Sequence, residues 1–323
     1  MKNKHIVIVS PALAHANNGN WQTARRWARF LASGYRVTLA VQWDGAGCDA
    51  MIALHARRSA ASIAAFAEAF PDKPLIVVLT GTDLYRDIHT ESSAQRSLQL
   101  ATQLVVLQPA GLQELDSNLR GKTQVIYQSA PTLKAISPER KSSARYFDVV
   151  MIGHLRDEKD PATFMRAASQ IKSSQVRLAH IGRALDPSLG AQAEATQAAH
   201  QHYRWLGDMP HATTRQRLKR SQLMVITSKM EGGANVIIEA VTSGVPVLAS
   251  DISGNRGMLG AGYPGYFPGG DATKLAELID RAATDGEFYG QLQAHCAALT
   301  HLFAPEVERA AVHQLVHNCL LQA

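Results

Sequence analysis

The sequence predicts an α/β protein with two doubly wound domains, each built around a parallel sheet. Short apolar runs rich in β-branched residues alternate with helical patterns along most of the 323 residues, which is typical of repeated β-α-β units. The alternation stops at 131–146, where prolines, serines and mixed charge remove any sustained period, and it then restarts. The length suits about two domains of ~150 residues each. We therefore expect an N-terminal domain at 1–130, a linker at 131–146, a C-terminal domain at 147–304 and a final helix at 305–323 that could pack back on the first domain.

In the N-terminal half, β-like and α-like segments alternate without interruption. The first helix has Trp27, Phe30 and Leu31 at core-facing spacing and ends at Ser33-Gly34. The predicted strands are His5–Ser10, Arg36–Val41, Ala50–Leu54, Pro74–Leu79, Gln103–Leu107 and Gln124–Tyr127. The predicted helices are Trp21–Ser33, Ser59–Phe70, Ser92–Thr102 and one that begins at Pro109.

The C-terminal half repeats this alternation and ends in helices. Its predicted strands are Phe147–Ile152, Val176–Ile181, Tyr203–Leu206, Leu223–Thr227 and Pro246–Ala249. Its predicted helices are Pro161–Ser173, Ala191–His200, Thr213–Arg220, one near Asn235, Ala272–Ala283, Glu287–Leu302 and Pro305–Leu321. Two such domains facing each other would have a cleft between their strand ends, where parallel sheets bind ligands.

Composition excludes several classes of protein. No apolar run approaches the ~18 residues of a membrane span, and the short apolar run after Met1 reads as a strand, so we expect a cytoplasmic protein without a membrane partner. Cys48, Cys296 and Cys319 are scattered and predict neither disulfides nor a zinc site. The net charge is +6, but the basic residues form no nucleic-acid module. A basic enzyme with anionic substrates fits this charge better.

The stretch from Ser228 to Ser250 carries the strongest functional pattern. Glu231 precedes a glycine pair, and Glu239 lies in an apolar helical run that begins near Asn235, so the order is strand, glycine loop, helix and strand. Amides at a helix N-terminus favour a diphosphate, and the residues that would supply them are Gly232, Gly233, Ala234, Asn235 and Val236. Glu239 could accept two hydroxyl groups of a ribose, and Glu231 could reach a sugar. The spacing alone fits equally well with an ordinary loop carboxylate and a partly exposed helical glutamate.

This stretch resembles the signature of family-4 glycosyltransferases of the GT-B fold. In that family the second glutamate holds the ribose and the first contacts the transferred sugar. The segment Ile152–Pro161 is similar to the first loop of the family's C-terminal domain, and Lys159 matches its lysine. The family's arginine position holds His154, while Arg156 follows two residues later. Gly153, Gly182 and Arg183 resemble further strand-end positions of the family. The resemblance implies a donor site that contains these residues.

Polar clusters also follow the strands predicted in the N-terminal domain. The family resemblance extends to a glycine-rich first loop and to a Gly-Thr-Asp sequence after a later strand. Each cluster could equally be a structural turn, but strand ends are where ligands bind. The candidate acceptor residues are Asn18, Gly19, Asn20, His55, Arg57, Arg58, Gly81, Thr82 and Asp83.

The combination of these motifs, from about Ile6 to about Gly257, is similar to the selenosugar synthases of selenoneine biosynthesis. This resemblance implies a UDP-sugar donor, UDP-N-acetylglucosamine first of all, and selenophosphate as nucleophile. The products would be a 1-selenosugar, UDP and phosphate. The chain has no Asp-x-Asp metal motif, so we expect no metal and no cofactor, with Lys159, Arg156 and the helix N-terminus neutralising the leaving UDP.

Other functions remain open from the sequence. A GT-B transferase with an ordinary oxygen or thiol acceptor would share the same donor motifs. A nucleotide-sugar-binding protein without turnover would share the fold, and a GT-B epimerase would consume donor without any acceptor.

Overall fold

The structure is a computed structural model that describes residues 4–11, 19–133 and 145–322. Contacts within the chain divide it into two compact units. The first unit comprises the described residues up to Ser129, the three residues Glu231–Gly233 and the segment from Pro305 onward. The second unit comprises the described residues of Ala130–Met230 and Ala234–Ala304. Most of the predicted linker, 134–144, lies outside the described residues.

The first unit is built on a parallel sheet whose described strands run in the order β2-β1-β3-β4-β5-β6. Its strands are β1 (His5–Val9), β2 (Arg36–Ala40), β3 (Ala50–Leu54), β4 (Leu75–Leu79), β5 (Gln103–Val106) and β6 (Thr123–Val125). Its helices are α1 (Gly19–Leu31), α2 (Ala60–Ala69), α3 (Ile88–Thr90), α4 (Ser92–Leu100), α5 (Ser117–Arg120) and α14 (Pro305–Gln322), with short turns η2 (Asp83–Asp87) and η3 (Pro109–Glu114).

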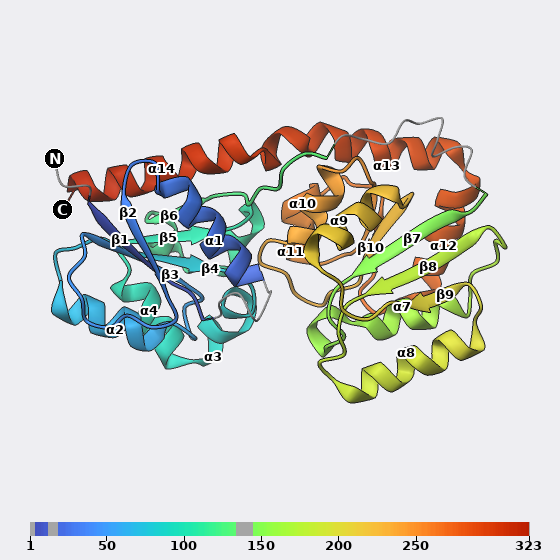
Figure 1. Cartoon of the computed structure of the whole chain (residues 1–323), viewed down its shortest axis with the longest axis horizontal. Helices are drawn as coiled ribbons and strands as arrows, with labels where there is room; N and C mark the ends of the chain where they lie inside the picture. Colours follow the sequence, from blue (N-terminus) through green and yellow to red (C-terminus); the bar gives the residue numbers. More distant parts are fainter. Residues whose placement is uncertain (1–3, 12–18, 134–144, 323) are drawn as a thin grey trace. The chain divides into compact units, whose positions relative to one another are not determined.

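Alternate residues of each strand pack on opposite faces of this sheet, as the two-residue period of a strand requires. Ile6 and Ile8 of β1 belong to a core that also contains Trp27 of α1 and Leu315 of α14. The intervening residues of β1 contribute to a second core, which contains Phe66 of α2 and Leu98 of α4. Figure 1 shows α2 and α4 on one side of this sheet and α1 with α14 on the other. Both faces are therefore covered, which explains why the central strands β3 and β4 are continuously apolar, whereas the edge strands β2 and β6 contain polar residues.

A buried carboxylate ties α14 to the rest of the first unit. Glu308 of α14 is 1 % exposed. Its carboxylate accepts hydrogen bonds from Arg26 Nε at 2.6 Å, Trp27 Nε1 at 2.7 Å and Ser129 Oγ at 2.5 Å. A buried charge is tolerated only when its lone pairs are satisfied in this way. The C-terminal helix is thus an integral part of the first unit.

The second unit is also built on a parallel sheet, with the described strands in the order β12-β11-β10-β7-β8-β9. Its strands are β7 (Phe147–Ile152), β8 (Val176–Ile181), β9 (Tyr203–Trp205), β10 (Leu223–Ile226), β11 (Val247–Ser250) and β12 (Tyr266–Phe267). Its helices are α7 (Pro161–Ala168), α8 (Pro187–Ala199), α9 (His211–Arg220), α10 (Asn235–Val241), α11 (Ser253–Leu259), α12 (Ala272–Thr284) and α13 (Gly286–Leu299), with turns η4 (Asp157–Lys159) and η5 (Thr300–Phe303). Figure 1 shows α7 and α8 on one side of this sheet and α9 with α10 on the other.

The predicted fold class is confirmed, because both units contain a parallel sheet covered by helices. Several boundaries differ. Helix α8 begins at Pro187 because Asp186 accepts a hydrogen bond from the Ser188 amide at 2.8 Å and caps it. The expected helix at Pro109 is a six-residue 3₁₀ turn, and the expected helix 161–173 ends at Ala168. Neither helix α11 nor strand β12 was predicted.

In the described part of the chain, no helix is both long and apolar enough to cross a membrane.

Candidate functional site

In the second unit, the strand order reverses between β7 and β10, and such a switch point is where open α/β sheets bind ligands. The loops that follow these two strands are joined. The Lys229 amide donates to the Glu158 carbonyl at 2.9 Å, and Thr227 Oγ1 donates to the Lys159 carbonyl at 2.8 Å. The β7 loop that carries Gly153, His154, Arg156 and Lys159 is therefore fixed against β10.

Backbone contact joins the β7 loop to the loop after β8. A Cβ atom at Gly182 would lie 1.9 Å from the Gly153 carbonyl oxygen, so no side chain fits there. The Gly182 carbonyl also accepts a hydrogen bond from Trp205 Nε1 at 2.9 Å. At Gly153, by contrast, an added Cβ would meet only the Lys159 side chain, at 3.7 Å. Gly182 is therefore required by packing, in addition to the donor-binding role predicted for it.

His154 is held as a neutral hydrogen-bond donor. Its Nδ1 accepts a hydrogen bond from the Arg183 amide at 3.1 Å, which leaves the ring proton on Nε2. Burial is the main cause that lowers the pKa of His154; Asp208 opposes it, and the charges of Arg183, Arg156 and Lys159 lower it further. The histidine that replaces the family's arginine thus brings an N–H group among cations without adding charge.

The cations beside His154 differ in how they are held. The stem of Lys159 lies against Gly153, while Arg156 Nε is 3.9 Å from a carboxylate oxygen of Glu158 and its side chain is 43 % exposed. Asp160 follows with a left-handed backbone (φ 43°) and caps α7 through the Thr163 amide. The chain turns away from the strand end at Asp160, so Arg156 and Lys159 stay in the loop.

Glu239 lies in the second turn of α10, where it accepts a hydrogen bond from His211 Nε2 at 2.6 Å. Its side chain is 13 % exposed. The residue before the helix, Ala234, provides no side-chain cap, so the amides of Asn235 and Val236 have no capping side chain there. This arrangement leaves both a carboxylate and helix amides for a ligand.

Glu231, Gly232 and Gly233 group with the first unit rather than with α10. Within that unit, a Cβ at Gly232 would lie 2.5 Å from the Thr80 carbonyl, and a Cβ at Gly233 would lie 2.7 Å from Cβ of Leu107. Close approach to protein backbone and side chain therefore requires these glycines, a reason that differs from the phosphate contact expected from the sequence. Glu231 is 9 % exposed.

In the first unit, the loops after β3 and β4 bring the predicted acceptor residues together. His55 has a left-handed backbone (φ 72°) directly after β3, which is uncommon outside glycine and often marks functional sites. Its Nε2 is 3.0 Å from Thr82 Oγ1, and its Nδ1 accepts a hydrogen bond from the Arg58 amide at 3.3 Å. Burial is the main cause that lowers the pKa of His55. His55 and Thr82 are thus joined in one polar cluster, with His55 buried beneath it.

Asp83 holds these two loops in place. Its carboxylate is fully buried and accepts hydrogen bonds from the amides of Ala56 at 3.0 Å, Thr80 at 3.0 Å and Gly81 at 2.8 Å. The carboxylate is thus occupied by backbone donors, and the predicted acceptor contacts are left to its neighbours.

Asp87 organises the arginines of this site. It accepts hydrogen bonds from Arg57 Nε at 2.8 Å and Arg86 Nε at 3.1 Å. Burial raises the pKa of Asp87, but the bonds from the two arginines lower it more, so the net shift is downward. The Arg58 side chain is exposed and has no hydrogen-bonding or carboxylate partner among the residues described here. Arg58 is therefore available to an anion.

The glycine-rich first loop is described only in part. Asn18 lies outside the described residues, while Gly19 and Asn20 form the first turn of α1, where the Gly19 carbonyl accepts a hydrogen bond from Thr23 Oγ1 at 2.9 Å.

Four further residues belong to these sites and were missed from the sequence: Arg86, Asp87, His211 and Arg215. Arg86 and Asp87 end the segment 79–87 that carries the Gly-Thr-Asp resemblance, but the resemblance assigns them no role, and His211 and Arg215 stand in no motif. Asp87 follows Asp83 by one helical turn, a spacing that could have flagged it, but His211 and Arg215 carry no comparable signal.

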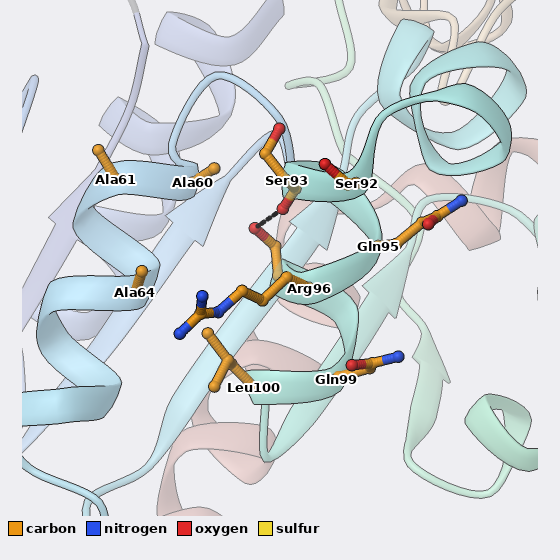
Figure 2. Close-up of a pocket in the computed structure, with 10 residues that line it drawn as sticks. Ala60, Ala61, Ala64, Ser92, Ser93, Gln95, Arg96, Gln99 and Leu100 are labelled. Carbon is orange, nitrogen blue, oxygen red and sulfur yellow. Dashed lines mark hydrogen bonds between the residues drawn. The ribbon is translucent and has the colours of Figure 1, made fainter.

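A surface groove of about 770 Å³ lies between α2 and α4. Figure 2 shows Ala60, Ala61 and Ala64 on one wall, with Ser92 and Arg96 on the other. None of the predicted site residues lines it. Separately, within the described ranges no three His, Cys, Asp or Glu residues gather as a metal site would require.

Residues 134–296, about half of the chain, match the model of the family described as "Glycosyl transferases group 1". The chain belongs to this glycosyltransferase family. Over 122 residues it is 33 % identical to glycosyltransferase 1 domain-containing protein 1 of Xenopus tropicalis. This match covers 37 % of the chain and 35 % of that protein, about a third of the relative's length.

Solved glycosyltransferases share the fold over the whole chain. Sucrose-phosphate synthase from Thermosynechococcus elongatus is 15 % identical with a TM-score of 0.79, and the two chains are covered to 99 % and 100 %. HepE from Anabaena, solved with UDP and glucose, is 17 % identical with a TM-score of 0.74, with 99 % of this chain and 100 % of HepE covered. At these identities the similarity establishes the fold, which is GT-B.

Proposed function

We propose that this glycosyltransferase transfers N-acetylglucosamine from its UDP derivative to selenophosphate. The observation that carries the donor half is the cluster at the ends of β7 and β8, where neutral His154 lies among Arg156, Lys159 and Arg183. Such a cluster suits a diphosphate, which offers acceptor oxygens and negative charge but no donor.

The donor assignment has further support in the second unit. Glu239 can accept ribose hydroxyl groups, and the amides of Asn235 and Val236 can donate to phosphate oxygens. Solved relatives of the same fold have been captured with such ligands. HepE from Anabaena was solved with UDP-glucose, and the pneumococcal O-GlcNAc transferase GtfA was solved with UDP and GlcNAc.

The candidate donor-site residues of the second unit would act on the leaving group. Lys159 and Arg156 would neutralise the charge that develops on UDP as its bond to the sugar breaks, and His154 would donate its Nε2 proton in a hydrogen bond. Gly182 would let the Gly153 loop pass close beside these side chains, and Gly153 would leave room for the stem of Lys159. Glu231, which belongs to the first unit, would contact the transferred sugar.

The acceptor assignment rests on the first unit. Arg57, Arg58 and the Thr82 hydroxyl suit a small tetrahedral anion, and His55 would orient the Thr82 hydroxyl toward it. Selenophosphate is already anionic at neutral pH, so it needs positioning rather than deprotonation.

The reaction balances as a displacement followed by hydrolysis. A selenium lone pair attacks C1 of the sugar, and the C1–O bond breaks as UDP leaves with the electron pair. Water then cleaves the Se–P bond and yields phosphate and the 1-selenosugar. The first step releases UDP, and the second step consumes one water.

The direct test is to incubate the protein with UDP-N-acetylglucosamine and one acceptor at a time: selenophosphate, thiophosphate, a simple sugar, or none. We expect a selenium-containing sugar by mass spectrometry, with UDP and phosphate formed in equal amounts. If a glycosylated sugar or a thiosugar forms and no selenosugar does, the acceptor is an ordinary oxygen or sulfur nucleophile and not selenophosphate. Donor consumption without any acceptor would indicate an epimerase or hydrolase. No turnover with tight UDP-sugar binding would indicate a binding protein.

A further inference from the structure

The carboxylate of Glu239 is held from one side only. Its Oε1 accepts the hydrogen bond from His211 Nε2 at 2.6 Å, a length typical of a charge-assisted bond. Its Oε2 has no hydrogen-bonding partner among the residues that the structure describes. The Glu239 side chain is nevertheless only 13 % exposed, while that of His211 is 48 % exposed. One oxygen of the carboxylate is therefore fixed by the protein and the other is left open.

A second basic residue of α9 lies behind the same carboxylate. Arg215 follows His211 by one helical turn and is 6 % exposed. Its Nη2 donates to the Pro131 carbonyl and Ser243 Oγ, both at 3.1 Å, while its Nε is buried with no hydrogen-bond partner in the described part of the chain. Burial lowers the pKa of Arg215 and the charge of Glu239 raises it. Arg215 thus keeps a positive charge close to Glu239 without bonding to it.

We propose that His211 is a positioning residue for the nucleotide, which acts by orienting the Glu239 carboxylate toward the ribose. The proposal rests on the donor half of the proposed function. A glutamate side chain has three rotatable bonds, and a ligand that needs both of its oxygens must freeze them. The bond from His211 freezes them beforehand, so Oε2 and the remaining lone pair of Oε1 can accept the two vicinal hydroxyl groups.

The role needs only the Nε2 proton, which both the neutral tautomer and the imidazolium provide. The positioning therefore requires no change of charge on His211. It also predicts which substitution will work: a glutamine can place an amide N–H near the position of Nε2, whereas an alanine cannot.

The test is a cycle between protein and ligand. UDP and 2′-deoxy-UDP are titrated by calorimetry into the wild-type chain, His211→Ala, His211→Gln, Glu239→Gln and the double variant His211→Ala/Glu239→Gln. His301→Ala is the matched control, because His301 is an exposed histidine of the same unit whose ring bonds the Ala298 carbonyl and does not touch Glu239. Melting temperatures are measured for every variant.

We expect the wild-type chain to prefer UDP over 2′-deoxy-UDP by about tenfold or more, the range of a hydrogen bond to a charged group. His211→Ala should lower the affinity for UDP by about fivefold. It should also reduce the preference for UDP over 2′-deoxy-UDP, because the lost orientation matters only for the ribose hydroxyls. His211→Gln should bind UDP within about twofold of wild type. In the double variant, the loss of affinity for UDP should not exceed that of Glu239→Gln alone, because the two residues act through one contact.

The outcomes separate the two proposals. If the wild-type chain binds neither nucleotide, the proposed donor is wrong and the role of His211 falls with it. If the wild-type chain binds UDP with preference but His211→Ala keeps both affinity and preference, the donor assignment stands and the positioning role is wrong. If His211→Ala weakens UDP and 2′-deoxy-UDP equally, or if His211→Gln fails to restore binding, His211 supports the fold rather than Glu239.

Discussion

The two units place polar residues at the ends of parallel strands, but they hold them by different means. In the first unit, the buried carboxylates of Asp83 and Asp87 bind the loop amides and the arginines directly. In the second unit, the loops are held by backbone contact at Gly182, and the cations Arg156 and Lys159 stay in a loop beside neutral His154. The first unit thus fixes its strand-end loops with buried anions, and the second fixes them by close backbone packing.

The largest effect is expected at Gly182, where backbone packing holds the second unit's loops. In Gly182→Ala, the new Cβ would overlap the Gly153 carbonyl, 1.9 Å away, so one of the two loops must move. We expect the second unit to lose about 3 kcal/mol of stability and the chain to lose UDP binding. Gly153→Ala is the matched variant, since its Cβ meets only the Lys159 stem at 3.7 Å, and its melting temperature should stay near that of wild type. Equal melting temperatures for both variants would show that backbone packing does not hold this site.

Acid should destabilise the second unit through His180. Burial lowers the pKa of His180 to about 4, below its ordinary value of about 6.5 in an unfolded chain. Because the folded pKa is depressed, the histidine contributes its full stability above about pH 6.5 and loses it as the pH falls toward 4. The wild-type chain should therefore lose about 3 kcal/mol relative to His180→Phe over this window.

Denaturant titrations at pH 7, 5.5 and 4 measure this difference, with His301→Phe as an exposed control. A gap between wild type and His180→Phe that stays constant with pH would contradict the depressed pKa.

In the first unit, removal of the Asp83 carboxylate tests whether buried anions hold the loops. Asp83→Ala leaves the amides of Ala56, Thr80 and Gly81 without their partner, and we expect a loss of about 2 kcal/mol. Asp83→Asn keeps one acceptor oxygen, so its loss of stability should be smaller. Amide hydrogen exchange should rise at the β3 and β4 loops and stay unchanged in the second unit. Protection that is unaltered at these loops would mean that other contacts hold them.

The smallest effect is expected at Arg58. Its side chain is exposed, so Arg58→Ala should leave the melting temperature unchanged while the KM for the anionic acceptor rises about tenfold. The KM for the UDP-sugar should not change. Arg96→Ala is the matched control, because Arg96 is an exposed arginine of the same unit in the groove between α2 and α4. Equal KM values in the two variants would remove Arg58 from the acceptor site.

The fold could be predicted from the sequence because its signal is local. Apolar runs such as Ile76–Val78 reveal strands by their own composition, and Asp160-Pro161 reveals the start of α7. The 3₁₀ turn at Pro109 and the short helix α11 carry weaker periodicity, so their form follows from packing instead.

The site could be predicted only where a residue belongs to a motif. Glu239 and Lys159 stand in recognisable segments, whereas the role of Gly232 depends on Thr80, about 150 positions away. The partners of Glu239 and of Glu308, His211 and Arg26, are equally invisible to local patterns. Long-range contacts decide which side chains stay available to a ligand, and the spacing of residues in the sequence does not predict such contacts.

The proposed reaction is best tested by the rate of UDP release from UDP-N-acetylglucosamine at increasing selenophosphate concentrations, in wild type and in Lys159→Ala. We predict that release depends on selenophosphate and saturates, and that Lys159→Ala lowers kcat by about 100-fold with little change in the KM for selenophosphate. UDP release at the same rate without selenophosphate, or a Lys159→Ala variant as active as wild type, would contradict the account.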